Sequence, residues 1–196
     1  MRTTILGCLS LLIAISAKGQ SKVAAKAHIN DLGVTAGGYF VVSNPLNLGV
    51  AWALEGTFAH RITSVPLVSL SVELPVACSS TSSIPTISGT TLARSYTSFF
   101  ITPGVRLSLV PSFPVTPYIA IGVGLAHFNR HLNGGATSSN TTAAFDVGAG
   151  LDIRMAPFIS LRGELRDFNS GGLGLQTLVS GRQNNLFATV GLALRF

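Results

Sequence analysis

The chain has 196 residues, of which 47% are apolar and only 10% are charged. Soluble domains carry about a quarter charged residues, so this composition favours a membrane location, with a tight oligomer as the alternative. The net charge is +6, but no basic stripe with interleaved aromatic residues accompanies it, so we expect no nucleic-acid partner.

The first segment has the pattern of a secretory signal peptide. Arg2 supplies a positive charge, residues 5–15 form a short apolar run, and Ala17, Lys18 and Gly19 fit the small-x-small cleavage rule. We therefore expect residues 1–19 to be removed and residues 20–32 to form a periplasmic N-terminal segment. A transmembrane anchor is the alternative, but the run is shorter than the about 20 residues of a spanning helix.

The rest of the chain, residues 33–196, alternates between apolar and polar or small residues, which is typical of strands with one apolar face. Each alternating segment has at least the roughly 9–11 residues that a tilted membrane strand needs. We expect eight strands, at residues 33–43, 47–60, 64–78, 95–110, 115–129, 141–155, 158–168 and 186–196.

The connections between these strands alternate in length. Those at 61–63, 111–114 and 156–157 are short, whereas those at 79–94, 130–140 and 169–185 are long and polar. An exported apolar chain without a second long apolar run can cross a membrane only as a closed barrel. We therefore predict an all-β fold, an eight-stranded antiparallel up-and-down transmembrane β-barrel with short periplasmic turns and longer outer loops. A soluble lipocalin-like barrel, with its apolar face inside, is the alternative.

The charged residues test this prediction independently. The apolar residues alone decide which face of each strand is the lipid face, and the charges should then fall on the opposite face. The faces opposite the apolar ones carry five acids and five arginines, and no charge enters the central apolar positions. The predicted lumen network consists of Glu55, Glu73, Arg106, Asp146, Asp152, Arg154, Arg162, Glu164, Arg166 and Arg195. Charges inside a narrow barrel must pair, which favours a filled lumen; an ion path or gate is the alternative.

Aromatic residues gather near the strand ends, as in the girdles of membrane barrels, although some point inward by phase. One group is expected at the periplasmic rim: Phe58, Phe113, Tyr118, Phe158 and Phe196. A second group is expected nearer the outer rim: Phe99, Phe128, Phe145, Phe168 and Phe187.

Three segments resemble the fifth, sixth and seventh strands of small OmpA-like and opacity-protein-like outer-membrane barrels. They are residues 117–126 (PYIAIGVGLA), 144–152 (AFDVGAGLD) and 159–166 (ISLRGELR). The resemblance covers residues 33–196 and implies a place in the bacterial outer membrane. It also implies that the terminal strand, ending on Phe196, is the signal shown to the barrel-assembly machinery.

No catalytic motif is complete. Some small outer-membrane barrels are lipid A deacylases with a His-x-Ser-Asn motif, but here His127, Phe128 and Asn129 lack the serine nucleophile. His127 and His131 have a spacing that suits a helix rather than a strand end, so we expect no metal ion, and no cofactor is expected.

We therefore expect a non-enzymatic barrel with a structural or surface-interaction role. Its expected partners are outer-membrane lipid, the barrel-assembly machinery and an unidentified loop ligand. A narrow pore and a lipid A-modifying enzyme are the alternatives.

Overall fold

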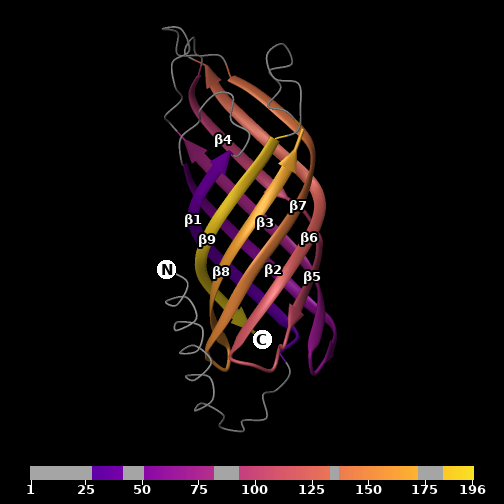
Figure 1. The fold of residues 1–196 in the computed structure, drawn as a ribbon. Coiled ribbons are helices and arrows are strands. Elements are labelled where there is room, and N and C mark those ends of the chain that lie inside the picture. Colours follow the sequence, from indigo (N-terminus) through magenta and orange to yellow (C-terminus); the bar gives the residue numbers. More distant parts are fainter. Residues whose placement is uncertain (1–27, 42–50, 82–92, 133–136, 172–182) are drawn as a thin grey trace, which may run out of the picture.

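In the computed structural model the chain forms a closed barrel of tilted antiparallel strands (Figure 1). The structure describes residues 28–41, 51–81, 93–132, 137–171 and 183–196. The strands are β1 (Asn30–Val41), β2 (Ala51–Val65), β3 (Val68–Thr81), β4 (Ala93–Ile101), β5 (Gly104–Leu109), β6 (Val115–Leu132), β7 (Thr137–Ala156), β8 (Ile159–Ser170) and β9 (Gln183–Arg195).

Among these described residues, we find no helix with the length and apolarity to cross a membrane.

The barrel closes because β1 pairs with both β2 and β9. The strands β4 and β5 share one position in the wall, since both pair with β3 on one side and β6 on the other. Their pairing register with β6 is unchanged across the gap at Thr102 and Pro103, where proline has no N–H to donate to the ladder. The ring therefore has the eight positions predicted from sequence.

The two ends of the barrel differ. At one end, called the turn end, Pro66–Leu67 and Pro157–Phe158 are two-residue turns, and Asn30 and Phe196 exchange backbone hydrogen bonds of 2.9 and 3.0 Å. The opposite end, called the loop end, is where β1, β3, β6 and β8 finish (Figure 1).

Several boundaries differ from the expected ones. The strand β1 begins at Asn30, so residues 30–32 belong to the barrel and not to the preceding segment. The turn expected at 61–63 lies at Pro66–Leu67, where the fixed φ of proline suits a turn, and residues 61–63 form a bulge instead. The long loop expected at 130–140 is wrong, because β6 and β7 continue to Leu132 and from Thr137.

The outer wall between the ends is apolar. Large side chains are exposed at alternate positions of the strands, among them Trp52, Val72, Ile121, Val147, Leu165 and Leu192. The intervening side chains point into the lumen and are buried. Val50, an apolar position of the strand expected at 47–60, lies outside the described residues. This arrangement matches lipid outside and a polar interior.

Two inward glycines make room for lumen side chains. A Cβ at Gly150 would lie 2.2 Å from the Tyr118 ring, and a Cβ at Gly33 would lie 2.6 Å from the Arg162 guanidinium. Glycine at these positions therefore leaves room for bulky lumen side chains, Tyr118 from the neighbouring β6 and Arg162 from β8 beyond β9.

Candidate functional site: the barrel lumen

The middle of the lumen is organised around Arg166 of β8, which is 1% exposed. Its guanidinium forms ion pairs with Glu55 at 3.0 Å, Asp146 at 2.6 Å and Glu164 at 2.5 Å, and with Glu73. The four carboxylates come from β2, β3, β7 and β8. One arginine thus ties together strands from opposite sides of the barrel.

A second ion-pair cluster lies nearer the turn end and is centred on Asp31 and Asp152. Arg162 of β8 pairs with both carboxylates, each at 2.8 Å. Arg195 of β9 lies 3.0 Å from Asp152 and 3.6 Å from Asp31. The pairing offsets much of the cost of burying these charges.

Arg106 and Tyr118 connect the two clusters. Arg106 binds Glu73 at 2.5 Å on one side and lies 3.5 Å from Asp31 on the other. Its guanidinium sits 4.2 Å from the centre of the Tyr118 ring, and the Tyr118 hydroxyl donates to Glu164 at 2.9 Å. The charged groups therefore form one continuous network, which we call the lumen network.

An aromatic layer covers the lumen network on the side of the loop end. The rings pack edge-on and stacked, with centroid separations from 4.6 to 5.8 Å, and each side chain is at most 2% exposed. We call this layer the aromatic cap; it consists of Tyr39, Tyr96, Phe100, Phe128, Phe168 and Phe187. Tyr39 also donates to Asn185 at 2.7 Å.

The structure brings together nine of the ten charged residues predicted for the lumen. Arg154 stands apart, because its guanidinium donates to the Pro111 carbonyl at 2.9 Å and makes no ion pair with the described residues. Sequence reasoning missed Asp31, which was assigned to the segment before the barrel. The alternation of Asp31, Gly33 and Thr35 on one face was the signal that could have found it.

The expected aromatic girdles are partly wrong. Phe128, Phe168 and Phe187 belong to the aromatic cap rather than the outer rim, and Tyr118 lies inside the lumen network. The other expected rim residues are exposed, Phe58, Phe99 and Phe145 on the wall and Phe113, Phe158 and Phe196 at the turn end. Whether an aromatic side chain points inward or outward on its strand therefore predicts its location better than its distance from the strand end.

His127 and His131, for which we expect no metal ion, lie on β6. The imidazole Nδ1 of His127 is 2.7 Å from the Thr141 hydroxyl, and that of His131 is 3.2 Å from the Thr137 hydroxyl. Over the described part of the chain, no group of three metal-ligating side chains is found. These histidines act as cross-strand hydrogen-bonding partners between β6 and β7.

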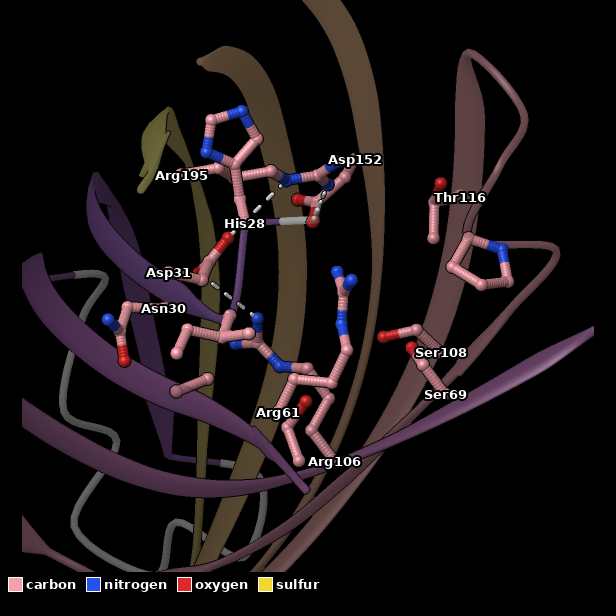
Figure 2. A pocket seen from close by; sticks show the side chains of 14 residues that line it. His28, Asn30, Asp31, Arg61, Ser69, Arg106, Ser108, Thr116, Asp152 and Arg195 are labelled. Carbon is pink, nitrogen blue, oxygen red and sulfur yellow. Dashed lines mark hydrogen bonds and ion pairs between the residues drawn. The ribbon is translucent and has the colours of Figure 1, made fainter. Parts of the chain in front are cut away.

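At the turn end the lumen opens into a pocket, which we call the mouth pocket (Figure 2). It borders the second ion-pair cluster on the side of the turn end. Residues of β1, β2, β3, β5, β6, β7 and β9 line it. Arg61, Arg106 and Arg195 face it together with Asp31 and Asp152. Filling of the lumen is therefore incomplete on this side.

An apolar outer wall around a charged and aromatic interior defines a transmembrane β-barrel. The chain belongs to the outer membrane protein beta-barrel domain family, whose model matches residues 5–196. Its place is the bacterial outer membrane.

Solved structures show the same fold. Neisserial surface protein A is 14% identical with a TM-score of 0.64, and the match covers 85% of this chain and 97% of that one. A major outer membrane protein from Thermus thermophilus is 16% identical with a TM-score of 0.55, covering 86% and 98%. Ail, the attachment invasion locus protein of Yersinia pestis, is 10% identical with a TM-score of 0.52, covering 86% and 97%. No curated protein sequence matches the chain.

Proposed function

We propose that this protein is a non-conducting outer-membrane barrel that acts as a structural scaffold and presents its loop end to partners at the cell surface. The proposal rests on one observation, that two successive layers of side chains fill the lumen. The aromatic cap closes it near the loop end, and the lumen network crosses it below. An ion moving along the axis would have to break buried ion pairs and part a packed aromatic layer.

Conductance in a planar lipid bilayer tests the closed lumen. The full-length protein, refolded in detergent and added to the bilayer, is expected to give no current steps beyond those of detergent alone. Regular single-channel steps that scale with salt concentration would instead support the narrow-pore alternative.

The loop end has the form of a display surface. Residues Thr137–Ala143 of β7 pair only with β6 among the described strands, because pairing with β8 begins at Ala144. In this region β7 thus rises above β8 (Figure 1), while β6 stays paired with β4 up to Leu132, and the outward side chains of Thr137, Ser139 and Thr141 are polar. Polar strands that extend beyond the apolar wall suit contact with water and with a surface ligand.

Labelling of intact cells tests this orientation. In a Cys78→Ser background, Ser139→Cys is expected to react with a membrane-impermeant maleimide, whereas Ser112→Cys in the turn between β5 and β6 should react only after lysis. The reverse pattern would place the turn end outside and contradict the proposal.

We also propose that the barrel is not an enzyme and that its partners are outer-membrane lipid and the barrel-assembly machinery. His127 is engaged with Thr141 and has no serine beside it in the motif. Phe196, 58% exposed at the end of the last outward row, offers the assembly machinery an accessible aromatic group. Lipid A of unchanged mass after expression of the protein is the expected result, and a deacylated product would support the enzyme alternative.

A further inference from the structure

We propose that the mouth pocket binds a phosphate-class oxyanion between Arg61 and Arg106, with hydroxyl groups of β3 and β5 completing the site. The proposal stands on the pocket alone and does not depend on whether the barrel conducts or displays a surface ligand.

The charges of the mouth pocket do not balance. Three arginines and two aspartates line it, which leaves one positive charge in excess. Both aspartates are already engaged: Asp152 by Arg162 at 2.8 Å and by Arg195 at 3.0 Å, and Asp31 by Arg162 at 2.8 Å. Both acids therefore already have cationic partners, and of the three arginines at the pocket only Arg61 makes no ion pair with the described residues.

Arg106 carries a donor without an acceptor. The side chain is 3% exposed, its Nε binds Glu73, and its Nη1 lies 3.5 Å from Asp31. Its Nη2 is buried and has no hydrogen-bond partner. Buried donors are almost always satisfied, so this nitrogen can still donate a hydrogen bond to a ligand oxygen that reaches it from the pocket.

Arg61 supplies the second cationic group. Figure 2 shows its guanidinium extending into the open part of the mouth pocket, with Asp31 on one side and Ser108 on the other, and no interaction drawn to it. Within the described residues Arg61 has no ion pair. Its charge faces the pocket, where an anion would neutralise it.

Serine hydroxyls complete the donor set. Ser69 and Ser71 of β3 are buried beside the pocket at 2% and 7% exposure, and Ser108 comes from the adjacent β5. Each hydroxyl can donate to an oxyanion or accept from water. Donors therefore converge from β2, β3 and β5.

The number and directions of these donors define the ligand class. A carboxylate presents its acceptors in one plane, whereas a tetrahedral oxyanion presents acceptors on every side. The pocket offers a cavity of about 30 Å³ to the centres of water-sized atoms. A single water needs roughly 10–15 Å³ of such space, so the cavity takes about two to three oxygen-sized groups of a ligand. Free inorganic phosphate and a lipid phosphomonoester are the two sources of this chemistry.

Calorimetric titration of the full-length barrel with inorganic phosphate tests the site. The protein is refolded in a phosphate-free zwitterionic detergent at constant ionic strength. We expect saturable binding of one ion per chain, weakened about tenfold or more in Arg61→Gln, because a charged hydrogen-bonding partner is lost. Ser69→Ala should weaken binding about threefold and serves as the second variant if Arg61→Gln does not fold.

Arg130→Gln, which removes one positive charge near the other end of β6, is the matched control and should leave the Kd within about twofold. A parallel measurement in phosphatidylcholine vesicles with and without phosphatidic acid separates the sources. An Arg61-dependent rise in Tm caused by phosphatidic acid assigns the lipid phosphate, and its absence beside phosphate binding assigns the free ion. No saturable signal from either source, or a phosphate Kd unaffected by Arg61→Gln, would overturn the proposal.

Discussion

Asp31, close to the turn end of β1, accepts a hydrogen bond from Arg162 of β8, with 2.8 Å between Oδ1 and Nη2. In the wall β9 lies between these two strands, so the pair joins them through the lumen rather than along a ladder. Arg195 of β9 and Arg106 of β5 approach the same carboxylate at 3.6 and 3.5 Å. Asp31 therefore links β1 to β5, β8 and β9 through the lumen, near the place where β1 and β9 close the barrel.

Replacing Asp31 by Asn should therefore destabilise the barrel. Arg162, Arg195 and Arg106 would keep their charges near an uncharged amide, and we expect a loss of about 2 kcal/mol in the free energy of unfolding. Urea titration in lipid vesicles, followed by the fluorescence of Trp52, measures it. Asp167→Asn is the control, because this carboxylate makes no ion pair among the described residues and should change stability by less than about 0.5 kcal/mol. Equal effects of the two changes would contradict the role given to Asp31.

Glu73 and Glu55 should respond differently to the same change. Glu73 binds both Arg106 and Arg166, so Glu73→Gln leaves two buried cations with a weaker partner and should cost about 3–5 kcal/mol. Glu55 is one of four carboxylates around Arg166, and neither of its oxygens has a hydrogen-bond partner. Glu55→Gln should be close to neutral in the same urea assay. A large loss for Glu55→Gln would show that Arg166 depends on all four acids.

The space around lumen glycines gives a third prediction. In Gly150→Ala the new methyl group would collide with the Tyr118 ring, and we expect a loss of about 1–3 kcal/mol as the ring shifts. Gly163, one strand along the same wall, has nothing within 4 Å of its Cβ position. Gly163→Ala should be neutral or stabilising by up to about 1 kcal/mol. Thermal unfolding of the two variants in parallel gives the comparison.

The turn between β5 and β6 contains a strained residue. Val110 has a φ of 44°, a left-handed conformation that β-branched side chains disfavour. Val110→Asn should raise stability by about 1 kcal/mol, since asparagine tolerates this conformation better. Val110→Ala keeps an unfavourable Cβ without the branch and should gain less. An unchanged Tm for Val110→Asn would mean that the turn relaxes without cost.

The side-chain phase of each strand could be predicted from the sequence, and the ion pairs could not. Alternation around Trp52, Leu165 and Leu192 separates the lipid face from the lumen face, because a charge on the lipid face is costly. The partners of Arg166 depend on the register and tilt of the strands. The alternation of apolar and polar residues along one strand gives no information about either. Asp31 was missed because the predicted strand began two residues after it.

The aromatic cap and the long β6–β7 hairpin escaped prediction for other reasons. The phase of Phe168 and Phe187 shows that they face inward, but not that they meet at one height from different strands. Beyond the membrane both faces of a strand are polar, so Ser138, Ser139 and Asn140 show no alternation and resemble a loop in sequence. Their pairing with β6 becomes visible only when the register of the two strands is known.

The central claim is that the apolar wall of a closed barrel faces lipid, and fractionation followed by a heat-shift gel tests it most directly. The protein should remain in the outer-membrane fraction without detergent, and in mild detergent the unboiled form should migrate differently from the boiled one. Recovery of the folded protein in the soluble fraction, or identical migration before and after boiling, would contradict the account.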